Sequence, residues 1–228
     1  MPGFAGFDTG VYPGDTVMQF LIGNSNLVWC GYYLAPAPSH PGTSWKGKLQ
    51  TLQGMGYGVA PVYVGQQVTG PGSKNPSADQ GTTDGAAAAA LMTADGFAAG
   101  SYAYLDIENG PPLTQPQQDY IVSWSAAMVA AGFGAGVYCS HLIAVDVHNL
   151  VPNARMWVFN VPTIVAHPVP NPYPDPNPAL SGYVGAYAWQ LGQNCQIAVA
   201  SGGTLTVDVD SAITDDPGAP DAAGASDS

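Results

Sequence analysis

Short runs rich in valine, tyrosine and tryptophan recur along this chain, and helix-length segments separate most of them. The runs are apolar on both faces, which is typical of strands in a parallel sheet that helices cover. Eight strands are expected, at Ala5–Asp8, Val28–Leu34, Gly58–Val64, Ser101–Glu108, Ala135–Ser140, Arg155–Asn160, Ala186–Leu191 and Thr204–Asp210. Strand–helix alternation with eight strands predicts closure, so the expected fold class is α/β, a TIM-type (β/α) barrel.

Helix signals occupy the gaps after the first five runs. The clearest helix is expected over Pro116–Ala131, where Thr114 and Gln117 form a capping box. The other helices are expected at Gly14–Ile22, Trp45–Met55, Gln80–Gly96 and Ser140–Leu150. Seven prolines between positions 162 and 178 indicate extended chain instead, and the twelve residues before the last strand are too few for a crossover helix. The sequence therefore predicts five βα units followed by three strands with few or no regular helices.

The chain of 228 residues is long enough for one large domain. Residues 1–213 are expected to form the barrel domain, and residues 214–228, rich in Asp, Ala, Gly and Ser, are expected to be a flexible acidic tail. No apolar run approaches the ~20 residues of a membrane span. The N-terminus has neither the cationic region nor the hydrophobic stretch of a signal peptide.

Charge excludes several classes of partner. The net charge is −12, with four cations against sixteen acids, so neither nucleic acid nor anionic lipid is an expected partner. The low charged fraction and the many neutral polar residues are typical of extracellular proteins. Cys30 and Cys139 lie in apolar runs and are expected to be buried, and with Cys195 they make an odd count that gives neither a disulfide framework nor a zinc motif. No cofactor and no metal are expected.

Acidic residues stand at the ends of three predicted strands, and in a βα barrel the chemistry lies at the C-terminal ends of the strands. Asp8 ends the first strand, Asp106 and Glu108 end the fourth, and Asp208 and Asp210 end the eighth. Because side chains alternate along a strand, the two acids of each pair share a face and lie ~6–7 Å apart along the strand. The first and last strands of a closed barrel are neighbours, so Asp8 is expected near Asp208.

Carboxyl groups held this close cannot all ionise at their usual pKa, and a raised carboxylic acid beside a carboxylate is suited to cleavage of glycosidic bonds. An aspartate at a strand end is also often a turn former or a helix cap. Magnesium or calcium is a further reading of clustered carboxylates, but the sequence has no EF-hand loop and no phosphate-binding glycine motif. Glu108 is the one glutamate of the chain.

Other candidate binding residues lie on or near the same rim. Aromatic rings there could stack on sugar faces, and amide side chains could hydrogen-bond sugar hydroxyl groups. The aromatic candidates are Tyr33, Tyr63, Tyr138, Trp157 and Trp189. The amide candidates are Gln66, Gln67, Asn160 and Gln190.

Several motifs together resemble one family. They are Gly6-Phe7-Asp8, Pro61–Gln67, Tyr104–Glu108, Trp189-Gln190 and Val207–Asp210, and they extend over about residues 3–213. In order and spacing they look like the bacterial glycoside hydrolase-like domain of unknown function, which is similar to the family-25 lysozymes (N-acetylmuramidases). Those lysozymes have five βα units followed by three strands.

The resemblance implies a role for each carboxyl. Glu108 would be the general acid, and Asp106 would orient the N-acetyl group of the substrate or stabilise a cation-like transition state. Asp8 and Asp208 would position the substrate and tune those pKa values. Asp210, which stands where the lysozymes more often have Asn, is expected to bind the substrate. The implied substrate is the β-1,4 bond between N-acetylmuramic acid and N-acetylglucosamine in peptidoglycan.

Two main functions follow from these observations. The first is a hydrolase of peptidoglycan or a related polysaccharide, monomeric and secreted or associated with the cell wall. The alternative is a non-catalytic glycan-binding or wall-associated module on the same barrel. A chitinase-like enzyme is a weaker third interpretation, because the upstream aspartates of its longer motif are missing and Ala103 and Tyr104 occupy that stretch.

Overall fold

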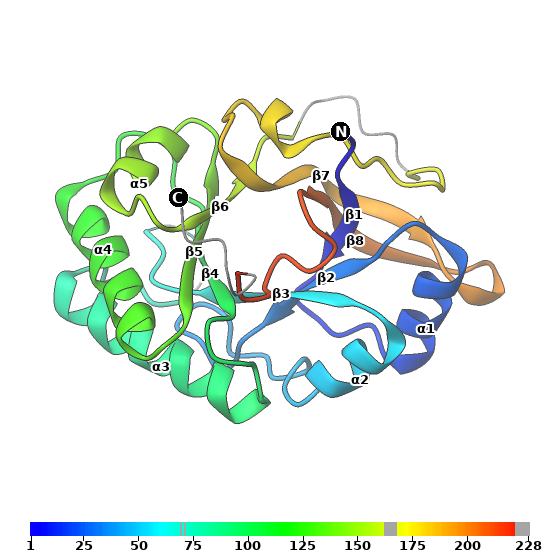
Figure 1. Cartoon of the computed structure of the whole chain (residues 1–228), viewed down its shortest axis with the longest axis horizontal. Helices are drawn as coiled ribbons and strands as arrows, with labels where there is room; N and C mark the ends of the chain where they lie inside the picture. The colour runs from blue at the N-terminus through cyan, green and yellow to red at the C-terminus, as the bar shows by residue number, and fades with distance from the viewer. Residues whose placement is uncertain (69, 71, 162–167, 222–228) are drawn as a thin grey trace.

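Eight strands close into one barrel in chain order (Figure 1). The structure is a computed structural model that describes residues 1–68, 70, 72–161 and 168–221. The strands are β1 (Phe4–Asp8), β2 (Trp29–Tyr33), β3 (Gly58–Val64), β4 (Tyr102–Ile107), β5 (Gly134–Ser140), β6 (Arg155–Phe159), β7 (Ala186–Ala198) and β8 (Thr204–Ala212). The predicted α/β barrel is confirmed.

The direction of the last strand differs from the prediction. β1 to β7 are parallel, but β8 pairs antiparallel with both β7 and β1. A parallel β8 was expected and is wrong, because so short a connection after β7 permits only a hairpin. β8 also continues to Ala212, so Asp208 and Asp210 lie within the strand and not at its end. Asp208 nevertheless pairs with Asp8, which sets the two carboxyls side by side.

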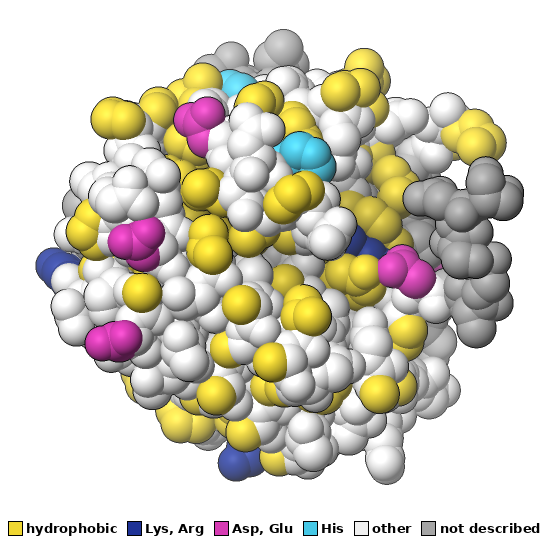
Figure 2. Space-filling view, turned by 60° about the vertical axis from the view of Figure 1, so that its left-hand side comes forward, with side chains coloured by type: hydrophobic (Ala, Val, Ile, Leu, Met, Phe, Trp, Pro, Cys, Tyr) yellow, Lys and Arg dark blue, Asp and Glu magenta, His cyan; other side chains and the backbone are white. Residues whose placement is uncertain are grey.

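Five α-helices are present in the described residues, each between consecutive strands from β1 to β6. They are α1 (Asp15–Asn24), α2 (Leu49–Met55), α3 (Ala78–Asp95), α4 (Gln115–Ala130) and α5 (Ala144–Leu150). The capping box at the start of α4 is present as predicted. Figure 2 shows the side of the molecule on which α3 to α5 lie, where charged side chains are sparse. Two short 3₁₀ turns, Pro178–Ser181 and Ala200–Gly202, are the only helical elements described after α5.

The proline-rich segment covers the side of the barrel that has no helix. Residues 168–177 are not helical, as expected, and residues 162–167 lie outside the described residues. Val169 and Tyr173 are buried in the outer core, and Asn26 hydrogen-bonds both the N–H and the C=O of Tyr173. The Ser211 hydroxyl on β8 donates to the Pro176 carbonyl. This segment therefore replaces a crossover helix as the cover of β8 and β1.

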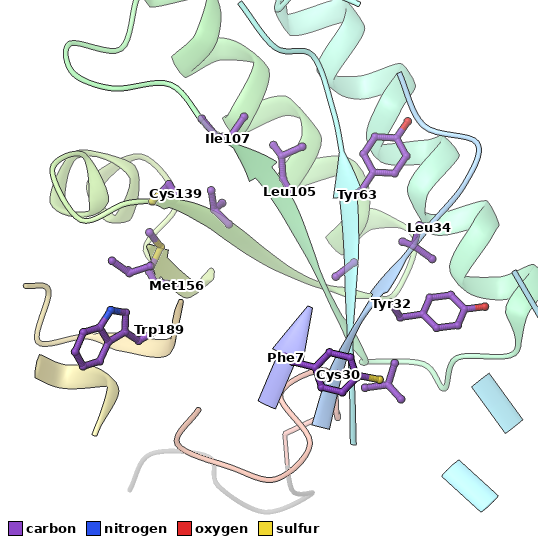
Figure 3. Packing of buried hydrophobic residues seen from close by; sticks show 14 of the residues in the cluster. Phe7, Cys30, Tyr32, Leu34, Tyr63, Leu105, Ile107, Cys139, Met156 and Trp189 are labelled. Atoms are coloured by element: carbon purple, nitrogen blue, oxygen red, sulfur yellow. The ribbon is translucent and has the colours of Figure 1, made fainter. Parts of the chain in front are cut away.

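Two layers of side chains form the core. Inside the barrel, the Trp157 ring packs edge-on against Trp29 and Tyr104, with centroids 5.3 and 5.5 Å apart. Outside it, side chains of the alternate residues pack between strands and helices, as Leu105 and Ile107 show in Figure 3. This alternation decides which residues reach the mouth of the barrel.

The chain after β8 closes the N-terminal end of the barrel. The Asp216 carboxylate accepts from the Val59 N–H, and the Arg155 guanidinium donates to the carbonyls of Pro217 and Ala219 and to Asp221. A flexible tail was expected from residue 214, but residues 214–221 pack against the first residues of β3, β4 and β6. The remaining residues of that expected tail, 222–228, lie outside the described residues. No helix in the described part of the chain is long and apolar enough to cross a membrane.

Candidate active site

Four carboxyls meet in a small cavity at the C-terminal ends of the parallel strands. Asp8, Asp106, Glu108 and Asp208 line this cavity of about 50 Å³. The other lining residues are Tyr33, Val62, Tyr138, Trp157, Gln190 and Gln193. The convergence expected from the strand pattern is therefore present in the structure.

Asp8 is enclosed at the end of β1. The neighbouring strand carries Gly31 at this level, and a methyl group there would lie 2.6 Å from the Asp8 Cβ, so the glycine makes room for the carboxyl. The Tyr33 hydroxyl donates to Asp8 Oδ1 at 2.6 Å. Burial, followed by the charge of Asp208, raises the Asp8 pKa to about 7, although the bond from Tyr33 opposes the shift.

The end of β4 presents one buried and one exposed carboxyl. Asp106 is buried and its Oδ1 has no hydrogen-bond partner, whereas Glu108 is exposed. Burial, followed by the charges of Glu108 and Asp8, raises the Asp106 pKa well above its usual value. The Gln67 side chain holds the backbone between them, because its Nε2 donates to the Asp106 carbonyl at 2.9 Å and its Oε1 accepts from the Glu108 N–H at 3.4 Å.

Asp208 is oriented by β7. Asn194, in the left-handed backbone region at φ 54°, donates its N–H to Asp208 Oδ1 at 2.7 Å. Gln190 donates to Asp208 Oδ2 at 2.6 Å and accepts from the Tyr138 hydroxyl. Burial raises the Asp208 pKa, and the hydrogen bonds that Asp208 accepts from Asn194 and Gln190 oppose the shift.

Asp210 lies beneath the cavity and not on its wall. Its side chain is fully buried, and the Trp157 indole N–H donates to its Oδ1 at 3.0 Å. Burial, followed by the charges of Asp8 and Asp208, raises the pKa of Asp210 well above its usual value. The expected contact between Asp210 and substrate therefore does not match the structure, and Asp210 supports Asp8 from below.

Two predicted aromatic residues point away from the cavity. Tyr63 packs against Trp124 of α4 with ring centroids 6.2 Å apart, and Trp189 donates its indole N–H to the Asn160 carbonyl. Both belong to the same buried cluster as Leu105, and Figure 3 labels all three among the residues of that cluster. The alternation along β3 and β7 puts them on the outer face, so their expected place at the cavity is wrong. Tyr33 and Tyr138 do line it, and Trp157 forms its buried floor.

Two predicted amide residues have other partners. Gln66 is buried, donates to Asp84 at 2.9 Å and accepts from the Asn75 N–H. Asn160 donates to the Ser181 carbonyl at 2.6 Å. Neither lines the cavity, and Gln190 is the predicted amide that does. Sequence reasoning missed Gln193, because β7 was expected to end at Leu191.

The cavity is acidic and has no cationic side chain in its lining. No group of three or more His, Cys, Asp or Glu side chains suited to a metal ion occurs among the described residues. A carboxylic acid in such a cluster can donate a proton to a leaving oxygen, and an ionised carboxylate beside it can stabilise positive charge on the neighbouring carbon.

The sequence model of one family, described as Rv2525c-like, glycoside hydrolase-like domain, matches residues 19–212. The chain belongs to this family. Among proteins with curated descriptions, none matches the chain. The Rv2525c-like domain of this chain is also similar in structure to several solved proteins.

Three of these solved structures can be compared with this chain by sequence identity, TM-score and coverage. The Tat-secreted protein Rv2525c of Mycobacterium tuberculosis, in complex with L-tartrate, has 18% identity and a TM-score of 0.63 over 94% of this chain and 97% of its own. A bacterial lysozyme from Streptomyces coelicolor has 14% identity and a TM-score of 0.59 over 93% of both chains. The modular autolysin LytC from Streptococcus pneumoniae, in complex with a synthetic peptidoglycan ligand, has 14% identity and a TM-score of 0.60 over 92% of this chain and 46% of its own. At identities this low, the structural similarity shows a shared fold and nothing more.

Proposed function

We propose that this Rv2525c-like domain is a glycoside hydrolase that cleaves the glycan of bacterial peptidoglycan, as a muramidase, with Glu108 as the general acid. The observation that carries the proposal is the arrangement at the end of β4, where Glu108 is exposed at the cavity and Asp106 is buried two residues before it on the same strand. A proton donor must reach the glycosidic oxygen, and Glu108 is the carboxyl that solvent reaches most freely.

The other carboxyls take supporting roles in this proposal. Asp106 orients the N-acetyl group of the substrate or stabilises the cation-like transition state from within the cavity. Asp8 and Asp208 position the sugar, and the hydrogen bonds from Tyr33 and Gln190 fix their orientation. Because the cavity of about 50 Å³ is close to the volume of one or two water molecules, the sugar ring lies over it and only a substituent enters.

A secreted or wall-associated monomer fits this function. One protein of the same fold is described as Tat-secreted, and another was solved with a peptidoglycan ligand. The acidic, lysine-poor composition is consistent with a place outside the cytoplasm.

Release of reducing ends from purified peptidoglycan tests the proposal. We expect the wild type to release them and Glu108→Gln to lose at least about 100-fold in rate, since general acid catalysis contributes about that much or more. Asp146→Asn is the matched control, because it removes the same charge from an exposed position on α5. Equal rates for the wild type and Glu108→Gln would remove Glu108 from the mechanism.

A non-catalytic glycan-binding module is the second candidate. The burial of Asp8, Asp106 and Asp210, with raised pKa values, favours it, because buried protonated carboxyls can serve structure without chemistry. Glycan binding by the wild type without release of reducing ends between pH 4 and 8 would favour this candidate, and any turnover would exclude it.

A further inference from the structure

The ends of β7 and β8 leave the barrel as a two-stranded ribbon. Their pairing continues from Cys195 with Val207 to Ala198 with Thr204. Figure 1 shows the orange ends of these strands projecting from the side of the barrel. Gln193, at the base of the ribbon, lines the carboxyl cavity, so the ribbon is continuous with the site.

The two faces of the ribbon differ. One face is buried and carries Cys195, Ile197 and Val207. The Val169 N–H of the proline-rich segment donates a hydrogen bond to the Gln196 carbonyl. The ribbon is therefore anchored on one side and does not depend on a partner for its position. The opposite face carries Gln196, Thr204 and Thr206, whose side chains are exposed.

The exposed face continues the row of side chains that starts in the barrel. Asp210, Asp208, Thr206 and Thr204 alternate along β8 and so share one face, with steps of about 7 Å between successive members. Asp210 is fully buried, Asp208 is half-buried and both threonines are exposed. The row therefore leads from the floor of the cavity to the surface of the molecule.

The chemistry of this face matches a saccharide. Residues 192–207 contain no charged side chain, in a chain with sixteen acids. Amide and hydroxyl side chains each donate and accept hydrogen bonds, as the hydroxyl and N-acetyl groups of sugars do. A step of about 7 Å brings Thr206 within reach of a sugar linked to the one over the cavity.

We propose that Gln193, Gln196, Thr204 and Thr206, which we call the ribbon face, form a second binding site for an uncharged sugar unit next to the one held over the cavity. The inference rests on the proposed function, because it assumes that a glycan chain crosses the carboxyl cavity. The ribbon face makes affinity depend on chain length, and it takes no part in bond cleavage.

Peptidoglycan glycan fragments of defined length test this site. Binding is measured to Glu108→Gln, with and without Gln196→Ala and Thr206→Ala together, using a single N-acetylated sugar and chains of two to eight sugars. We expect affinity to rise with length, and the double substitution to weaken binding of the chains about tenfold while leaving that of the single sugar unchanged. In otherwise wild-type protein, the same pair should raise KM for long chains without changing kcat.

Matched controls separate the ribbon face from a general surface effect. Gln53→Ala with Thr83→Ala removes the same two side-chain types from exposed positions on α2 and α3, and it should change no affinity. Thr206→Ser retains the hydroxyl and should restore most of the length dependence. Circular dichroism and the Tm check that each variant is folded.

The outcomes are distinct from those of the catalytic test. Length-dependent binding that the double substitution removes supports the ribbon face even if no bond is cleaved, and in that case only the proposed catalysis fails. A loss that is as large for the single sugar as for the chains, or no loss at all, overturns the ribbon face. Absence of binding to every fragment overturns it as well.

Discussion

Asp8 sits at the end of β1 with its carboxyl enclosed by Tyr33, Gly31 and Asp208. Its pKa of about 7 means that the folded protein keeps a proton there between about pH 4 and pH 7, where the unfolded chain has released it. The contribution of Asp8 to stability is therefore fully present below about pH 4 and is lost as the pH rises through 7. The raised pKa values of Asp106, Asp208 and Asp210 act in the same direction.

We expect the Tm to fall between pH 5 and pH 8, and Asp8→Asn to make that fall smaller because the amide does not ionise. Differential scanning calorimetry at several pH values measures both effects. Asp146→Asn, at an exposed position on α5, is the control and should keep the slope of the wild type. A Tm that rises over this range, or an unchanged slope in Asp8→Asn, would contradict the assignment of a raised pKa.

Gln67 offers a test of how the backbone of β4 presents its two carboxyls. In Gln67→Glu, the protonated side chain can still donate to the Asp106 carbonyl, but the ionised form places a negative charge against that oxygen. We expect the ratio of variant to wild-type kcat to fall about tenfold or more as the pH rises, and Gln67→Met to be low at every pH. A ratio for Gln67→Glu that does not vary with pH would show that this contact does not position the carboxyls.

At the scale of elements, the alternation of strand side chains explains which predictions succeeded. It correctly brought Asp8, Asp106, Glu108 and Asp208 together, because each lies on an inward-facing position. The same rule places Tyr63 and Trp189 on the outer face of the barrel, so the prediction that their rings lie at the rim was wrong. The direction of β8 could be inferred only from loop length, and the bulges around Gly192 that orient Asp208 have no sequence signal of their own.

The C-terminal segment is the element whose role was least predictable. Its composition resembles that of a disordered tail, but a single buried cation binds it. The Arg155 guanidinium lies 3.5 Å from the ring centroid of Tyr102 and 4.3 Å from that of Tyr187, and it donates to the Pro217 carbonyl and to Asp221. These partners come from positions far apart in the chain, so composition alone could not reveal them.

We expect Arg155→Ala to lower the free energy of unfolding by about 3 kcal/mol, because it leaves buried carbonyls without donors. Urea denaturation followed by tryptophan fluorescence measures this loss. Lys48→Ala is the control, since the ion pair of Lys48 with Asp15 is exposed to solvent and should contribute little to the free energy of unfolding. Equal effects of the two substitutions would show that the segment 214–221 adds little to stability.

At the scale of the whole molecule, the net charge of −12 should weaken binding to the proposed substrate, because an anionic cell wall repels an acidic protein. The peptide stems of peptidoglycan carry carboxylates, and salt screens their repulsion from the protein at distances beyond ~8 Å at physiological ionic strength. We expect KM for intact walls to fall severalfold when the salt concentration rises from about 0.02 M to about 0.3 M. KM for uncharged fragments should stay constant over the same range. A KM for intact walls that rises with salt would mean that attraction between opposite charges dominates.

The fold as a whole was more predictable than the site. Barrel closure follows from eight strand patterns that mostly alternate with helices, whereas the site depends on contacts such as that of Asn194 with Asp208, which arise from an irregular backbone. The prolines correctly predicted an extended segment between β6 and β7. Its position over β8 and β1 could not be predicted, because it depends on single contacts such as that of Asn26 with Tyr173.

The central claim is that water cleaves a glycosidic bond at this cavity with the help of Glu108. Digestion of purified peptidoglycan in oxygen-18 water, followed by mass spectrometry, tests it most directly. The account predicts fragments from the wild type that carry one heavy oxygen at a new N-acetylmuramic acid reducing end, and none from Glu108→Gln. Labelled fragments from both proteins at equal rates, or no labelled fragments from a wild type that binds the glycan, would contradict it.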